Sequence, residues 1–201
     1  MIPGLLIVVS GPAGVGKGTI VRSMMENDPK FVLSISATSR IPRTNEIEGI
    51  NYYFKTREQF EEMIKNDELI EWVEYCGNYY GTPRDLVCSE IEKGKIVILE
   101  IEVDGALNVK RLFPDCVLCF IIPPDFSELE KRLRGRGTDT EESIIKRLGR
   151  AKDEFKYIEN YDYLVLNDSI ENAAQRIFSI VQAEQMRTNR NQLLIKKYKN
   201  I

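Results

Sequence analysis

The chain has 201 residues, of which 43% are hydrophobic and 29% are charged, and its formal net charge is −3. This composition suits one globular domain with a sizeable core and excludes a disordered chain. The slight excess of acidic residues disfavours nucleic acid as a partner, because a phosphate backbone requires a basic face.

The residue types present also limit the compartment and the chemistry. No apolar run approaches the ~20 residues that a membrane span requires, and the N-terminal run lacks a basic leader, so we expect a cytoplasmic protein without a membrane partner. There is no histidine, which excludes His-based triads and most catalytic zinc sites. Cys116 and Cys119 form a C-x-x-C within a strand-like run, where residues three apart point to opposite faces, which favours two buried thiols over a zinc site or a redox pair.

The first predicted elements are a strand and a loop that follows it directly. LLIVVS at 5–10 reads as a buried strand, and GPAGVGKGT at 11–19 fits the phosphate-loop pattern G-x-x-x-x-G-K. The residue after Lys17 is normally Ser or Thr, but here it is Gly18, and the hydroxyl comes one residue later. Glycines let backbone N–H groups converge on an anion at a helix N-terminus. The pattern therefore predicts an ATP-binding loop made of Gly11, Pro12, Ala13, Gly14, Val15, Gly16, Lys17, Gly18 and Thr19.

The remaining elements alternate between strand-like and helix-like segments. Further apolar strands are expected at 32–36, 96–102, 117–122 and 163–167, and amphipathic helices at 16–27, 102–113, 124–136 and 141–155. Nearly continuous hydrophobic strands indicate a parallel sheet covered by helices on both faces. We therefore expect an α/β fold with its ligands at the carboxyl ends of the strands.

Two segments interrupt this alternation. Residues 37–84 carry short aromatic strands (51–54 and 71–81) and one helical piece (57–67), which predicts an inserted subdomain between core segments 1–36 and 85–201. We expect Phe60 and Trp72 in the core of this insertion, and a helix with Pro83 at its first position. Residues 134–143, RGRGTDTEES, place glycines beside arginines and suggest a mobile flap.

Several motifs in order resemble one family. The GKGT ending of the loop, SISATSRIPRTNEIEGINYYF, IEWVEYCGNYYGTPR, RLRGRGTDTEESIIKRL and YLVLND are similar to guanylate kinase, of the nucleoside monophosphate kinases. The resemblance covers nearly the whole chain. It implies a single P-loop kinase domain with a parallel sheet flanked by helices, a GMP-binding insertion at 37–84 and a lid at about 134–143. It also implies ATP:GMP phosphotransfer to give ADP and GDP, with Mg²⁺, in purine nucleotide recycling.

The resemblance assigns residues to the GMP side of the site. A clamp on the GMP phosphate is implied for four residues, Arg40, Arg43, Tyr52 and Tyr80. Guanine presents adjacent N–H donors and two acceptors, so its pocket needs a carboxylate and a hydroxyl. The carboxylate role suits Glu71 and Glu102, and the hydroxyl role suits Ser36 and Thr82. Glu46 matches the acidic residue that follows the arginines in the family, and for each of these residues an exposed polar side chain is the alternative.

Other matches concern phosphoryl transfer and the ATP side. Arg132, Arg136 and Arg147 match the lid arginines and join Lys17, Arg40 and Arg43 as the expected catalytic set, while Arg134 and Arg150 read as solvated. Asn167 matches a position near the adenine, with an ordinary turn residue as the alternative. The family's D-I-D becomes Glu100-Ile101-Glu102, where Glu100 would act on magnesium through water and Glu102 would touch guanine.

Two rival functions remain. A non-catalytic guanylate-kinase-like module would use the same arginines to hold a phosphopeptide, but such modules lose phosphate-loop and lid residues that this chain keeps. A kinase for another nucleotide is the nearer rival, and the pair of Glu71 and Thr82 argues against it. The sequence does not identify a protein partner and does not determine the oligomeric state.

Overall fold

The computed structural model describes residues 4–75, 77–135 and 140–200. Its centre is a five-stranded sheet with the order β2-β7-β1-β8-β9, in which each neighbouring pair is parallel. The strands are β1 (Leu5–Ser10), β2 (Phe31–Leu33), β7 (Ile96–Glu100), β8 (Val117–Ile122) and β9 (Tyr163–Leu166). The parallel α/β architecture predicted from the alternating segments is thus confirmed.

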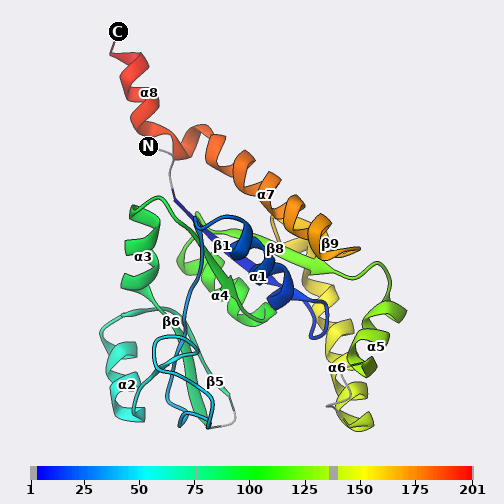
Figure 1. Ribbon diagram of the computed structural model, residues 1–201. Coiled ribbons are helices and arrows are strands. Elements are labelled where there is room, and N and C mark those ends of the chain that lie inside the picture. The colour runs from blue at the N-terminus through cyan, green and yellow to red at the C-terminus, as the bar shows by residue number, and fades with distance from the viewer. Residues whose placement is uncertain (1–3, 76, 136–139, 201) are drawn as a thin grey trace.

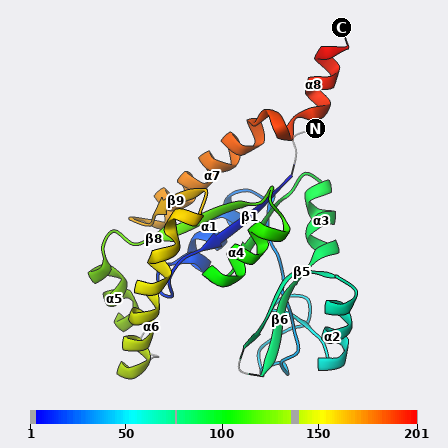
Figure 2. The same cartoon turned by 180° about the vertical axis from the view of Figure 1, so that it is seen from behind.

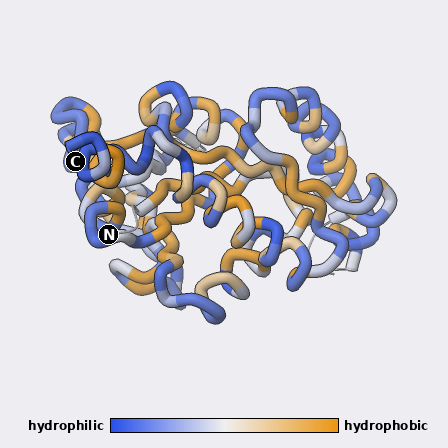
Figure 3. The backbone as a smooth tube through the Cα atoms, turned by 90° about the horizontal axis from the view of Figure 1, so that it is seen from above, coloured by the Kyte–Doolittle hydropathy of each residue, from blue (hydrophilic) through white to orange (hydrophobic). Residues whose placement is uncertain are grey.

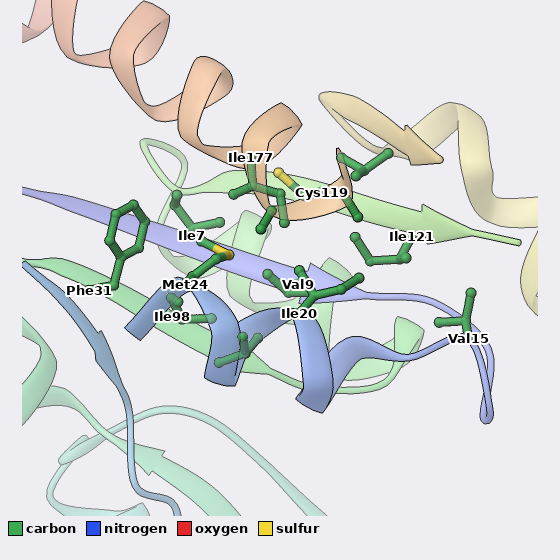
Figure 4. Close-up of a cluster of buried hydrophobic side chains, with 14 of the residues drawn as sticks. Ile7, Val9, Val15, Ile20, Met24, Phe31, Ile98, Cys119, Ile121 and Ile177 are labelled. Atoms are coloured by element: carbon green, nitrogen blue, oxygen red, sulfur yellow. The ribbon is translucent and has the colours of Figure 1, made fainter. Parts of the chain in front are cut away.

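Residues of β1 alternate between two hydrophobic cores, one on each face of this sheet. Ile7 and Val9 belong to the first core, where Val15 of the phosphate loop and Ile20 of α1 also pack (Figure 4). Leu6 and Val8 belong to the second core. Because both faces are covered, β1 is buried at every position and hydrophobic from Leu5 to Val9, although its side chains alternate. The hydropathy colouring shows the same arrangement, with apolar strands in the middle and more polar helices around them (Figure 3).

Helices cover both faces of the sheet. The first core receives α1 (Lys17–Asn27), α5 (Phe126–Gly135), α6 (Glu141–Glu154) and α7 (Ile170–Met186), and the second receives α3 (Arg84–Glu92) and α4 (Val103–Leu112). A 3₁₀ helix, Phe155–Asn160, joins α6 to β9, and α8 (Gln192–Lys199) projects from the body beyond α7 (Figure 1). Within the described ranges, no helix is long and apolar enough to cross a membrane.

A second, smaller sheet lies between β2 and α3 in the sequence. Its order is β4-β3-β6-β5, from β3 (Ala37–Thr38), β4 (Tyr53–Phe54), β5 (Leu69–Tyr75) and β6 (Asn78–Pro83), with α2 (Arg57–Lys65) beside it. A capping box between Thr56 and Gln59 starts α2. Phe60 is fully buried, as expected, and stacks on Tyr79 with 5.3 Å between ring centroids. The expectation for Trp72 was wrong: this side chain is 44% exposed, because β5 is an edge strand.

The small sheet and the pair α5 and α6 extend toward the same side of the central sheet, with α4 between them (Figures 1 and 2). Several element ends differ from the sequence prediction. The strand expected at 96–102 ends at Glu100, because Glu102 becomes the N-cap of α4. Pro83 is the N-cap of α3 rather than its first residue, so Thr82 remains in β6. These shifts place Glu102 and Thr82 at element ends that border the site.

The two cysteines of the C-x-x-C are buried, as expected. Cys116 precedes β8 and Cys119 lies within it, and both are free thiols. Burial raises the pKa of Cys116 to about 11 and that of Cys119 well above its usual range. Both thiols are therefore held protonated as part of the core.

Candidate active site

The phosphate loop connects the end of β1 to the start of α1. Gly11, Gly14 and Gly16 have φ angles of 139°, 89° and 102°, which L side chains rarely adopt. At Gly16, a Cβ atom would lie 2.6 Å from Nδ2 of Asn167. Helix α1 has no side-chain cap and no acidic residue in its first turn, so its N-terminal dipole is available to an anion. The predicted loop thus has the backbone geometry that phosphate binding requires.

Lys17 lies over this loop. Its Nζ donates hydrogen bonds to the carbonyl oxygens of Gly11 and Pro12, the second at 3.3 Å. The same Nζ is 3.9 Å from Oε1 of Glu102. The residue is buried, so its charge acts in a poorly hydrated position beside the loop.

Two predicted residues, Asn167 of the ATP side and the lid arginine Arg132, donate hydrogen bonds to the phosphate loop. Asn167, which follows β9, donates from Nδ2 to the carbonyl of Val15 at 2.6 Å. Arg132 of α5 donates to the same carbonyl at 3.3 Å and to the carbonyl of Asn167 at 3.3 Å. Arg147 lies half-buried on α6, whereas Arg136 and residues 136–139 of the expected lid lie outside the described residues.

The arginine loop after β3 is held by one carboxylate. Arg40 donates two hydrogen bonds to Glu46, at 2.7 and 2.9 Å, and Oε2 of Glu46 also accepts from the backbone N–H of Arg43 at 2.8 Å. The hydrogen bonds from Arg40, and then from the Arg43 backbone, lower the pKa of Glu46. Glu46 therefore fixes the position of Arg40, while the side chain of Arg43 is exposed.

Two tyrosines complete this corner. The guanidinium carbon of Arg40 is 5.5 Å from the ring centroid of Tyr52. Tyr52 in turn contacts Tyr80 edge to face, with 6.0 Å between ring centroids. The structure thus brings together three of the four residues of the predicted phosphate clamp, on β6 and the loop before β4.

A buried acid and a buried hydroxyl face each other between β5 and β6. Oγ1 of Thr82 donates to Oε1 of Glu71 at 2.7 Å, and Glu71 is only 7% exposed. Burial raises the pKa of Glu71, and the bond from Thr82 opposes that effect. A Cβ on Gly105, in the first turn of α4, would lie 3.7 Å from Oε2 of Glu71. Ser36 is half-buried just before β3, and its carbonyl accepts from the N–H of Tyr53 at 2.9 Å.

The two glutamates that replace the expected aspartates take separate positions. Glu100 ends β7, and a Cβ on Gly18 would lie 3.3 Å from its Oε2. Loss of hydration raises the pKa of Glu100, Lys17 lowers it, and Glu102 raises it further. Glu102 is half-exposed at the start of α4, between Lys17 and Arg150, whose NH2 is 3.8 Å from its Oε2.

The sequence reasoning missed Arg150 and Glu154 of α6. Arg150 is exposed, as expected, but it also lies near Glu102 and donates from Nε to Oε1 of Glu154 at 3.0 Å. Glu154 follows Ile144 and Ala151 on the buried side of α6. Glu154 occupies a position at which the helical spacing of α6 predicts an apolar residue, and that signal could have identified it.

Taken together, a parallel sheet with a glycine-rich phosphate loop after its first strand defines a P-loop nucleotide-binding protein. A solved structure of shikimate kinase from Bacteroides thetaiotaomicron has the same fold, with a TM-score of 0.50, 13% identity, and 89% of this chain and 98% of that chain covered.

More specific comparisons identify the family. The family model described as guanylate kinase matches residues 4–184. Guanylate kinases of Halalkalibacterium halodurans and Shouchella clausii are 53% and 52% identical, over 97% and 98% of this chain and 94% and 95% of their own lengths. The crystal structure of guanylate kinase from Anaplasma phagocytophilum matches with a TM-score of 0.72 and 35% identity, and covers 94% of this chain and 89% of that one. The chain belongs to the guanylate kinase family and is a kinase.

Proposed function

We propose that this enzyme transfers the γ-phosphoryl group of ATP to GMP, giving ADP and GDP, with the phosphate loop holding ATP and the insertion at 37–84 holding GMP. One observation supports this arrangement most directly. Glu102, the N-cap of α4, is 3.9 Å from Lys17, and Gly105, three residues later, borders Glu71. A single helix start therefore joins the phosphate loop to the buried acid of the insertion, so ATP phosphates and a guanine base can be held on adjoining sides.

The GMP phosphate is bound by Arg40, Arg43, Tyr52 and Tyr80 in this proposal. Guanidinium groups suit a phosphate dianion because they offer paired donors in a fixed geometry. The two hydrogen bonds from Arg40 to Glu46 hold the guanidinium in place before the phosphate arrives. Glu46 thus acts as a support for the clamp rather than as a direct phosphate ligand.

The guanine base is read by the buried pair on β5 and β6. The carboxylate of Glu71 accepts from N1–H and from the exocyclic amine, while the hydroxyls of Thr82 and Ser36 face the remaining polar groups of the base. Thr82 already occupies one lone pair of Oε1, which orients the carboxylate. Glu102 contributes a second carboxylate on the guanine side.

The transfer step needs positioning and charge neutralisation rather than a general base. A phosphate monoester has its second pKa near ~6, so the GMP acceptor oxygen is already ionised at neutral pH. The transferred group spreads negative charge over its equatorial oxygens, and cations stabilise that charge. The positive charge comes from Lys17, Arg132, Arg136 and Arg147. Asn167 lies on the adenine side. The absence of histidine from the chain is then no obstacle.

Magnesium is the metal that this site would use. The described residues hold no cluster of three or more His, Cys, Asp or Glu side chains suited to a metal ion. Mg²⁺ in kinases needs only one or two protein oxygens, because phosphates and water complete its octahedron. Glu100 would hold it through water, and the hydroxyl of Thr19 is a second oxygen at the helix start. The ion would neutralise charge on the β- and γ-phosphates.

An ADP-release assay across GMP, dGMP, AMP, CMP and UMP tests the proposal. We expect turnover with GMP and poor turnover with AMP, CMP and UMP. Preference for AMP, CMP or UMP would refute the guanine-reading role. Tight GMP binding without any ADP release would identify a binding module instead.

A further inference from the structure

Glu154 is a buried acid that the proposed chemistry does not use. It is the last residue of α6, and its side chain is only 7% exposed. Oε1 accepts from Nε of Arg150 at 3.0 Å, whereas Oε2 is buried without a hydrogen-bond partner in the described part of the chain. A half-satisfied carboxyl is costly to bury, so its presence on the apolar side of α6 needs an explanation.

The groups around Glu154 come from three other segments. Arg150 lies on the same helix and also approaches Glu102, with 3.8 Å between NH2 and Oε2. Asp104 follows Glu102 in the first turn of α4, and Tyr161 follows the 3₁₀ helix, near Ser10 at the end of β1. The hydroxyl oxygens of Tyr161 and Ser10 are buried and, like Oε2, have no hydrogen-bond partner among the described residues.

Two carboxyl groups, Glu102 and Glu154, thus share one arginine. Burial first, and then the neighbouring Glu102, raise the pKa of Glu154 to about 7, while Arg150 opposes them. The neutral acid is therefore favoured at Glu154 more than at an ordinary glutamate. A neutral carboxyl can accept from Arg150 through one oxygen and donate to a carboxylate through the other.

We propose that Glu154 is a positioning residue that, with Arg150, holds the carboxylate of Glu102 on the guanine side of the site. The inference rests on the proposed role of Glu102 in GMP binding. Glu102 has one more methylene than the aspartate expected there, and its Oε1 is 3.9 Å from the Nζ of Lys17. Arg150 and Glu154 keep Oε2 toward α6, so Glu102 does not swing fully onto Lys17 and compete with the ATP phosphates.

This arrangement also links α6 to the start of α4. Arg147 lies one helical turn before Arg150 on α6. The contacts of Arg150 with Glu102 therefore place the helix that carries Arg147 relative to the GMP side. Loss of Glu154 should weaken the binding of GMP more than that of ATP, because Glu102, the residue it positions, is on the guanine side.

The test uses full-length chains with Glu154→Gln, Glu154→Leu and the matched control Asp153→Asn. The amide oxygen of Gln can still accept the hydrogen bond from Arg150, whereas Leu fills the apolar position and accepts none. We expect KM for GMP to rise ~5- to 20-fold in Glu154→Leu, because Arg150 loses the acceptor that orients it toward Glu102. KM for ATP should stay nearly unchanged. Glu154→Gln should stay within ~3-fold of the parent on the same grounds. Asp153 is exposed and pairs with Lys156, so its variant should be silent.

A double-mutant cycle with Glu102→Gln separates this inference from the proposed function. If Glu154 acts through Glu102, Glu154→Leu adds nothing to KM for GMP once Glu102 is changed. Additive effects, or equal losses in Glu154→Gln and Glu154→Leu, overturn the positioning role. If Glu102→Gln alone leaves KM for GMP unchanged, the proposed role of Glu102 fails, and the positioning role fails with it. Should Glu154→Leu not fold, as thermal unfolding would show, Arg150→Gln removes the shared cation and must raise KM for GMP in the same manner.

Discussion

Glu71 should decide which base the enzyme accepts, and Glu71→Gln tests that role. The carboxylate is 7% exposed and already accepts from Thr82 at 2.7 Å, so Oε2 and the second lone pair of Oε1 remain for a ligand. Gln keeps one acceptor but presents an amine where guanine also presents a donor. One charged hydrogen bond is worth ~1.5–3 kcal/mol, and ~1.4 kcal/mol is a factor of ten. We therefore expect kcat/KM for GMP to fall ~10- to 100-fold or more, while the poor use of AMP changes little or improves.

The stability of this variant provides an internal check. Burial raises the pKa of Glu71 in the folded chain above its unfolded value. An acid shifted this way contributes stability at low pH, and the contribution is lost as pH rises toward and through the folded pKa. Replacing it with Gln removes the cost of burying the anion, so at neutral pH the variant should unfold at a temperature no lower than the parent.

The assay is steady-state ADP release with GMP and AMP, with Glu74→Gln as the control. Glu74 lies on the same strand, is exposed and pairs with Arg57, so its variant should behave as the parent. Equal losses for GMP and AMP in Glu71→Gln would mean damage to the fold or to the phosphate clamp. Unchanged kcat/KM for GMP would make Glu71 a plain structural residue, and in either case the guanine-reading role would be abandoned.

Three further predictions concern the loop and the core. Lys17→Met should lower kcat at least ~100-fold, because a preorganised charge on the transferred group is lost, while calorimetry still detects GMP binding; normal turnover would refute its catalytic role. Gly16→Ala should lower the free energy of unfolding by ~1–2 kcal/mol from left-handed backbone strain alone, and the unfolding temperature by ~2–4 °C per kcal/mol. The close contact of the new Cβ with Asn167 should add to the loss. An unchanged unfolding temperature in calorimetry would contradict this geometry. Alkylation followed by peptide mass spectrometry should modify half-buried Cys88 long before Cys119, whose thiol is buried and has a raised pKa; the reverse order would contradict that burial.

The core of this fold could be predicted because its strands are covered on both faces. β1, β7, β8 and β9 each read as an apolar run, and the structure places all four in the parallel sheet. The strand expected at 32–36 ends earlier, at Leu33, because the chain leaves the central sheet there to enter the small one. The hydrophobic pattern of these residues does not indicate that the chain passes from one sheet to the other. Trp72 was misplaced for a related reason: hydrophobicity suggested burial, but an edge strand leaves part of the side chain in water.

The parts of the candidate site that motifs carry were predictable, and contacts between charged residues on separate helices were not. The phosphate loop is one continuous segment, so its spacing was sufficient. The contact of Arg150 with Glu102 joins α6 to α4, which are far apart in the sequence, while Glu154 accepts from Arg150 within α6. Charged residues on a helix usually face solvent, and only the folded chain shows that Glu154 is buried and that the exposed Arg150 reaches Glu102.

The geometry also gives a physical reason for the irregular residue in the phosphate loop. A Cβ at position 18 would lie 3.3 Å and 3.4 Å from the two carboxylate oxygens of Glu100, a tight contact with a group that ends β7. The side chain of Glu100 is one methylene longer than the aspartate expected there, so it reaches space that a Ser or Thr at position 18 would need. Gly18 and Glu100 are therefore complementary, and an oxygen near the start of α1 is supplied by the strand end instead of by the residue after Lys17. The missing hydroxyl then does not disqualify the loop, because the proposed magnesium ion would be held through water by the carboxylate beside Gly18.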